Sequence, residues 1–477
     1  MNDLALWTLA EASAAIAARQ VSSRELVEAC LARIAQWQPR INAFIDLRAD
    51  AARAAADAAD RAIAAGGPCS PLHGIPLAHK DMYYREGRVS TCGSTLRREW
   101  HATGTATVLR RLDAAGAIDL GTLNMAEWAG GATGHNIWFG DARNPWNPDR
   151  VTGGSSSGSG AAVAARLAFG SLGSDTGGSI RLPASMCGVT GLKPTYGAVS
   201  RHGAMPRAWT LDAVGPLART AQDCALILAA IAGPDPQDAS TAEAPGFAMP
   251  AVADGRAGRL ADTLAGTVIG VEASMLQAAD PSLRPALDTA LAVLGDLGVE
   301  LREVAIPELA AIFDLGGVIS TTEAASIHLQ QMRAQPSGYA PDLFTRMQAG
   351  LATPAVLYLH ALRMRGLLLE KVRASVFSRC NALFAPTVAV PVPTRAESRT
   401  ETAEDVGRIH GPLVRLTRPF NFLGLPSLSL PCGPDSAGMP VGFQLVGAPF
   451  AEAEILRLGM AYQSITAWHA RVPELPA

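Results

Sequence analysis

The chain has 477 residues, of which 48% are hydrophobic and 17% are charged, and its formal net charge is −3. This composition is sufficient for a large buried core and excludes a wholly disordered chain. The small net charge gives no electrostatic reason to expect nucleic acid or an anionic membrane as a partner.

The cysteines and the N-terminus indicate the cellular compartment. Seven cysteines are dispersed without a C-x-x-C pair, which argues against a disulfide framework or a zinc site. The first residues lack the basic start and apolar run of a signal peptide, and no stretch of about 20 residues is apolar enough to span a bilayer. We therefore expect a soluble protein of the reducing cytoplasm.

The first 65 residues are predicted to form a helical brace, followed by a main domain over 66–477. Ser22 to Glu25 has the spacing of a helix capping box, and Gly66-Gly67-Pro68 ends the last of these helices. The first strand is expected at 75–79 and runs into Lys80. A buried ammonium is costly unless its pKa falls, and the chain has only three lysines, so Lys80 is a candidate catalytic base.

Beyond this strand, helical and strand patterns alternate. Helices are expected at 105–115, 161–169, 221–232, 281–297 and 453–463, and strands at 117–120, 267–272, 299–306, 382–386, 427–431 and 441–446. Such alternation predicts an α/β fold around a mixed sheet. Residues 235–266 have the composition of an exposed linker and 307–378 are mostly helical, so 235–380 is predicted to be a linker and a substrate-shaping region.

Two clusters of serine and glycine, starting at Gly153 and at Thr176, flank the apolar helix predicted at 161–169. We expect both clusters to be loops, brought together at one end of the fold. A phosphate-binding loop is excluded because no lysine lies between Lys80 and Lys193, and a G-x-G-x-x-G fingerprint fails at Val163. A hydrolase elbow at 154–158 lacks the buried strand that should precede it.

The run from Gly153 to Gly158, followed by Asp175 to Pro183, resembles the defining motif of the amidase signature family. The resemblance extends to 74–81, 191–197, 215–219 and 424–433, and so covers most of the chain. It implies the amidase-signature fold, in which a central mixed sheet is covered by helices on both sides.

The resemblance also implies a Ser–Ser–Lys triad with Ser179 as nucleophile, Ser155 as bridging serine after a cis peptide bond, and Lys80 as base. Neutral lysine would take a proton through Ser155 and so activate Ser179. The oxyanion hole would be formed by backbone N–H groups of the loop around the nucleophile, namely Thr176, Gly177, Gly178 and Ser179.

Other residues near the motif are assigned supporting roles. Asp175 and Arg181 are expected to fix the loop through pairing, with a substrate carboxylate as the alternative partner of Arg181. Motif matching places Ala129, Gly130 and Gly131 along the acyl side of the pocket. Lys193 is expected to be structural.

The resulting prediction is an amidohydrolase that cleaves a small, apolar or aromatic amide without metal or organic cofactor. One alternative is a carbamate or ester hydrolase on the same triad, and another is a non-catalytic binding protein. A third is the glutamine-hydrolysing component of a tRNA-dependent amidotransferase, although Ala204–Trp209 departs from that subgroup and its later glutamine-recognition segment is not found. The sequence leaves the oligomeric state open, a homodimer included.

Overall fold

A computed structural model describes residues 3–250, 264, 266–400 and 402–474. Its centre is a mixed eight-stranded sheet with the order β10-β9-β11-β13-β12-β7-β8-β6. The pairs β10–β9 and β9–β11 are parallel, and the other neighbours are antiparallel. The strands are β6 (Gly170–Asp175), β7 (Thr190–Lys193), β8 (Ala213–Ala218), β9 (Val268–Glu272), β10 (Glu300–Val304), β11 (Ala382–Pro386), β12 (Ser427–Pro434) and β13 (Pro440–Gly447). The predicted α/β fold with a mixed sheet is confirmed.

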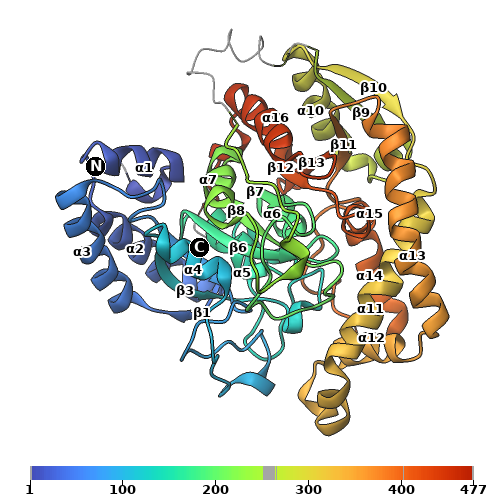
Figure 1. The fold of residues 1–477 in the computed structure, drawn as a ribbon, viewed down its shortest axis with the longest axis horizontal. Coiled ribbons are helices and arrows are strands. Elements are labelled where there is room, and N and C mark those ends of the chain that lie inside the picture. The colour runs from blue at the N-terminus through green and yellow to red at the C-terminus, as the bar shows by residue number, and fades with distance from the viewer. Residues whose placement is uncertain (1–2, 251–263, 265, 401, 475–477) are drawn as a thin grey trace.

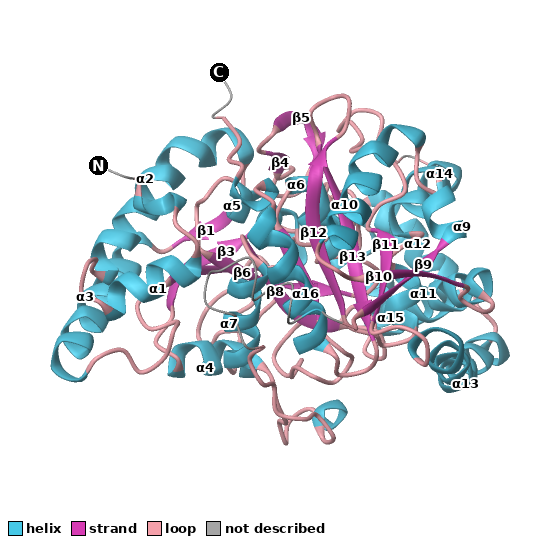
Figure 2. Ribbon diagram, turned by 90° about the horizontal axis from the view of Figure 1, so that it is seen from above, coloured by secondary structure: helices cyan, strands magenta, loops and turns pink. Residues whose placement is uncertain are grey.

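A second, three-stranded sheet has the order β1-β3-β2, with β1 at Phe44–Leu47, β2 at Pro76–Lys80 and β3 at Ile118–Leu123. In Figure 2 this sheet lies toward the side of the molecule that carries α1 and α3. β1 falls within the segment predicted to be entirely helical, and this part of the prediction is wrong, because Phe44 to Leu47 pairs antiparallel with β3. A short hairpin joins β4 (Arg143–Asn144) and β5 (Asn147–Val151).

Helices flank the large sheet, and α11 to α13 lie on the side opposite α1 to α3 (Figure 1). The helices are α1 (Leu9–Ala17), α2 (Ser23–Ile41), α3 (Ala49–Gly66), α4 (Thr107–Ala114), α5 (Ser157–Ala164), α6 (Arg181–Cys187), α7 (Ala221–Ile231), α9 (Ala273–Gln277), α10 (Arg284–Asp296), α11 (Leu309–Ala334), α12 (Pro341–Leu351), α13 (Ala355–Val372), α14 (Ala403–Val414), α15 (Arg418–Phe422) and α16 (Glu452–Ile465). The expected capping box is present, since Ser22 and Glu25 exchange hydrogen bonds with each other's backbone N–H groups. The helical prediction for 307–378 is also confirmed.

The N-terminal helices share their core with the strand that carries Lys80. Ile16 and Trp37 are buried in the same hydrophobic cluster as Leu77 of β2 and Phe443 of β13. The Ser23 hydroxyl also donates to the Gly74 carbonyl, just before β2. α1 and α2 therefore support β2 directly.

Three sequence-based expectations need correction here. Part of the first Ser/Gly cluster is helical rather than loop, because α5 begins at Ser157, and α5 ends at Ala164 before Arg166 takes a positive φ of 62°. In the predicted linker, Asp235 and Thr241 are buried, and Asp235 accepts from the Ser200 hydroxyl at 2.5 Å. Residues 251–263, also in that linker, lie outside the described residues.

Within the described part of the chain, no helix has the length and apolar character needed to cross a membrane. Six of the seven cysteines are buried, and only Cys69 is exposed.

Candidate active site

Lys80 is the last residue of β2, and its side chain is buried at the junction of the two sheets. Its Nζ donates to Ser155 Oγ at 2.6 Å and to Ser174 Oγ at 2.9 Å. Burial lowers the pKa of Lys80 to about 7, although the negative charges of Asp212 and Asp175 act in the opposite direction. A substantial fraction of this amine is therefore neutral near pH 7 and able to accept a proton.

Ser155 lies in a tight loop that precedes α5, and the Gly154–Ser155 peptide bond is cis, as the resemblance implies. The Gly154 N–H donates to the Ala132 carbonyl, and the Ser155 carbonyl accepts from the Ala126 N–H. A Cβ on Gly154 would lie 2.5 Å from the Gly131 carbonyl oxygen. Glycine is thus required where this loop packs against 131–134.

Ser179 follows β6 in the second Ser/Gly cluster. Its carbonyl accepts from the Ser156 N–H at 3.3 Å, which holds the two clusters together. Among the described residues, the Ser179 hydroxyl forms no hydrogen bond, so the direct contact in this structure is the one between Lys80 and Ser155. Catalytic hydrogen bonds are often formed only once substrate is bound.

The loop from Thr176 to Ser179 presents backbone N–H groups, but they are not equivalent. The Gly178 N–H donates to Asp175 Oδ1 at 2.8 Å. In the described structure, the N–H groups of Thr176, Gly177 and Ser179 have no acceptor. These three donors, rather than that of Gly178, are available to an incoming oxygen.

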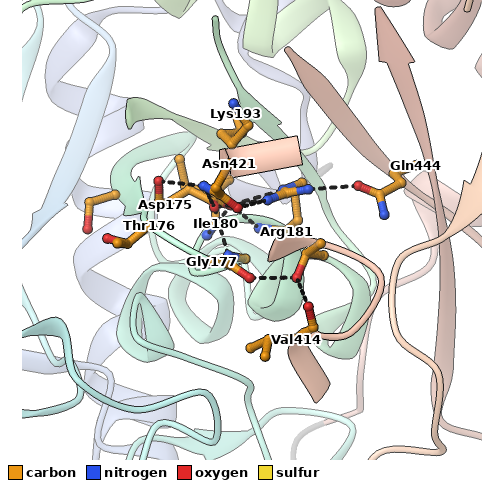
Figure 3. A network of polar contacts seen from close by, with 12 residues as sticks. Asp175, Thr176, Gly177, Ile180, Arg181, Lys193, Val414, Asn421 and Gln444 are labelled. Carbon is orange, nitrogen blue, oxygen red and sulfur yellow. Dashed lines mark hydrogen bonds and ion pairs between the residues drawn. The ribbon is translucent and has the colours of Figure 1, made fainter. Parts of the chain in front are cut away.

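Asp175 and Arg181 form a buried ion pair at 3.0 Å that fixes this loop (Figure 3). Asp175 also accepts from the N–H groups of Gly178 and Ile180, and the Arg181 guanidinium donates to the side chains of Asn421 and Gln444. Burial alone would raise the pKa of Asp175, but the charge and hydrogen bonds of Arg181 hold it at about 2. These contacts engage both side chains within the protein, and the supporting role of the pair stays a prediction.

Asp212 connects the loop to a neighbouring segment. The Thr176 hydroxyl donates to its carboxylate at 2.5 Å, and the N–H groups of Arg207 and Ala208 donate to the same carboxylate. Residues 207–208 are thus anchored beside the start of the loop. Thr417 Oγ1 donates to the Gly177 carbonyl of the same loop at 2.6 Å.

Ala129, Gly130 and Gly131 form a turn that borders a cavity of about 190 Å³. The turn is tight, with positive φ angles at Trp128 and Ala129, and the Gly130 carbonyl accepts from the Arg346 guanidinium. Gly130 and Gly131 line the cavity, whereas Ala129 is not among its lining residues. The remaining lining residues are Ala126, Glu127, Thr133, His135, Asn136, Ile137, Ala340, Asp342, Leu343, Arg346, Arg399, Thr400 and His410.

Lys193 is buried, and its Nζ donates to the Pro194 carbonyl at 2.9 Å. Burial and the nearby charge of Arg181 lower its pKa to about 7. Its structural role stays a prediction.

The sequence motifs did not identify Ser174, Asp212 or Thr417 as site residues. Ser174 lies in β6 directly before Asp175 of the motif. This position next to the motif is the sequence feature that could have identified it as a site residue. Asp212 and Thr417 are distant in sequence and are brought to the loop only by the fold.

The chain is similar to known proteins over nearly its whole length. The profile of the Amidase family matches residues 25–456. One component of the Glutamyl-tRNA(Gln) amidotransferase from Roseiflexus sp. (strain RS-1) is 40% identical, with 98% of each chain covered.

Two solved structures are similar over nearly their whole length. One comes from work on a vestigial protein complex and the evolutionary origins of an s-triazine catabolic enzyme, and it has 36% identity and a TM-score of 0.86 over 99% of this chain and 100% of that one. The other is the peptide amidase from Stenotrophomonas maltophilia, with 30% identity and a TM-score of 0.82 over 98% of each chain.

Proposed function

Because the chain belongs to the amidase family of enzymes that hydrolyse amide C–N bonds, we propose that it acts through an acyl-enzyme on Ser179. The observation that carries this proposal is the buried contact of 2.6 Å between Lys80 Nζ and Ser155 Oγ, beside the Ser179 loop. A lysine with a pKa of about 7 is suited to act as a general base at neutral pH.

In the first half of the reaction, Ser179 Oγ attacks the amide carbon while its proton passes to Ser155 and the Ser155 proton passes to Lys80. The amide oxygen becomes negative and accepts from the N–H groups of Thr176, Gly177 and Ser179. The proton then returns from Lys80 through Ser155 to the leaving nitrogen, the C–N bond breaks, and the acyl group remains on Ser179.

In the second half, water attacks the acyl carbon and gives its proton to the same relay. The bond between the acyl carbon and Ser179 Oγ breaks, and the proton is returned to Ser179. The products are a carboxylic acid and ammonia or an amine. No redox step occurs, so the cycle needs no external oxidant or reductant.

Ser179→Ala should abolish turnover of every substrate, because the acyl-enzyme cannot form. The measurement is hydrolysis of a panel of aliphatic amides, aryl amides, carbamates, esters and amino-acid amides, together with labelling by a fluorophosphonate. Wild-type protein should be labelled at Ser179 and the variant should not. Equal turnover by the two proteins would refute the proposal.

A second candidate has specific support. The sequence relative from Roseiflexus is named as one component of a Glu-tRNA(Gln) amidotransferase and matches from end to end, which favours a glutamine-hydrolysing component over a free-standing amidase. The similarity to peptide amidase supports the free-standing enzyme. Purified chain that hydrolyses small amides alone would favour the latter, and glutaminase activity that rises with partner proteins and tRNA would favour the former.

A further inference from the structure

A second cavity, of about 740 Å³, adjoins the smaller cavity described above. The two cavities share Asn136, Ile137 and Arg399 as lining residues, whereas no residue of the 176–179 loop lines the larger one. Charged side chains are prominent in its lining. They are Arg40, Arg143, Arg395, Arg399 and Asp141. We call this the arginine cavity, because four guanidinium groups meet there with one carboxylate.

The arginines of this cavity come from three segments that are far apart in the sequence: the last turn of α2, the start of β4, and the segment 394–399 after β11. Hydrogen bonds hold these segments in place. The Arg395 N–H donates to the Asp149 carbonyl at 2.7 Å, and Asn42 Nδ2 donates to the Phe139 carbonyl at 2.8 Å. The fold thus assembles the cavity and fixes the backbone around it.

Two of the arginines have no anionic partner within the protein. Arg40 Nη1 is buried and has no hydrogen-bond partner. The side chain of Arg143 is exposed and, in the described part of the chain, forms no hydrogen bond or ion pair. A buried N–H group without an acceptor is costly, and an acceptor placed inside the cavity would remove that cost for Arg40.

The other two arginines share a single carboxylate. Asp141 Oδ2 lies 2.9 Å from Arg395 Nη2 and 3.3 Å from Arg399 Nη2, and it also lies 3.1 Å from His135 Nδ1. One carboxylate offsets the charge of one guanidinium only. The four guanidinium groups of the lining therefore exceed its one carboxylate by three positive charges.

We propose that the arginine cavity binds the phosphate group of a small phosphorylated molecule. A phosphate group carries about −1.5 to −2 charges at pH 7 and three acceptor oxygens, so it offsets more of the excess charge than a single carboxylate does. Guanidinium groups bind phosphate through paired, charge-assisted hydrogen bonds. The volume leaves room for the rest of a small molecule, since ligand cavities typically measure about 300–1,000 Å³. This site goes beyond the function proposed above and does not depend on it.

The test is isothermal titration calorimetry of the wild-type protein with pyrophosphate, inorganic phosphate, adenosine monophosphate, adenosine and succinate. Pyrophosphate and adenosine monophosphate should bind with saturation, and adenosine, which has no phosphate, should not. Succinate should bind about tenfold or more weakly than pyrophosphate, because it offers less charge at any one point. Tighter binding of adenosine monophosphate than of inorganic phosphate would identify a phosphate ester as the ligand, and equal binding would identify free phosphate. No saturable binding of any phosphate compound would overturn the proposal.

Variants locate the binding. Arg40→Met and Arg143→Met should each weaken pyrophosphate binding about tenfold, because each removes a charged hydrogen-bond donor. Arg61→Met, which removes an exposed arginine of α3 that does not line the cavity, should leave the affinity unchanged. Unchanged affinity in both cavity variants would overturn the proposal. Since the Arg143 side chain has no partner, Arg143→Met should keep the wild-type unfolding midpoint, and it decides the test even if Arg40→Met does not fold.

A final comparison separates this site from the reaction at Ser179. Pyrophosphate should bind with wild-type affinity to Ser179→Ala and to protein labelled with a fluorophosphonate. Loss of binding after labelling would place the phosphate at Ser179 and overturn the proposal. Turnover by Ser179→Ala would instead refute the acyl-enzyme and leave the arginine cavity unaffected.

Discussion

At the scale of single residues, Lys80 determines how activity depends on pH. Only the neutral amine accepts a proton, and burial lowers the Lys80 pKa to about 7. We expect kcat/KM to rise about tenfold per pH unit below pH 7 and to level off above it. A pH–rate profile of the wild type, with Lys80→Met as the inactive reference, measures this. A profile that is flat between pH 5 and 8 would contradict the role of Lys80.

The same pKa shift has a consequence for stability. The pKa of Lys80 is lowered from 10.5 to about 7 in the folded protein, so between these values the unfolded chain binds more protons. Stability should therefore rise with pH across this window, and Lys80→Met should reduce that rise. It should not abolish it, because Lys193 is shifted to about 7 as well. Thermal unfolding of the wild type and of Lys80→Met at several pH values measures this difference. The same data serve as the stability control for the pH–rate profile.

Gly178 and Gly177 are adjacent glycines with different tolerance of a side chain. Gly178 has φ of 138°, and an added Cβ would lie 2.4 Å from Thr417 Oγ1, whereas the nearest atom to a Cβ on Gly177 is 3.9 Å away. We expect Gly178→Ala to lower the unfolding free energy by about 1–3 kcal/mol and to disorder the loop. Gly177→Ala should lower the unfolding free energy by much less. Denaturant unfolding of the pair measures the difference, and equal costs would contradict it.

At the scale of elements, the Asp175–Arg181 pair joins four of them. Asp175 ends β6, Arg181 begins α6, Asn421 lies in α15 and Gln444 in β13. Arg181→Met would leave a buried carboxylate without its counter-charge, at a cost of about 3–5 kcal/mol. The midpoint of denaturant unfolding should fall accordingly. A variant that keeps wild-type stability would show that Arg181 does not hold these elements together.

Most elements could be predicted because their patterns are local. The strand that ends at Lys80, the strand at 382–386 and the helix that starts after Thr220 each show periodicity or a cap within a few residues. β1 could not be predicted, because Phe44 to Leu47 forms a strand only through pairing with β3, more than 70 residues away. Asp212 and Thr417 were missed for the same reason. Each is an ordinary polar residue until the fold brings it to the 176–179 loop.

At the scale of the whole molecule, the N-terminal helices are predicted to be indispensable. Deletion of residues 1–65 would expose the apolar surface that Ile16 and Trp37 share with Leu77 of β2, and would remove β1 from the small sheet. We expect the truncated chain to aggregate rather than to form a stable main domain. Expression of residues 66–477, assayed by size-exclusion chromatography and circular dichroism, checks this. A monodisperse, folded product would instead show that the main domain folds without residues 1–65.

The lysine of the proposed relay is held between the two sheets. Lys80 ends β2 of the small sheet, while Ser174 is the next-to-last residue of β6 at the edge of the large one, and the amine nitrogen lies 2.9 Å from that serine oxygen. A sideways slip of one sheet against the other by an ångström or two would leave every helix and strand intact and yet separate donor from acceptor. Catalytic activity should therefore report the alignment of the two sheets more sensitively than a measurement of secondary-structure content.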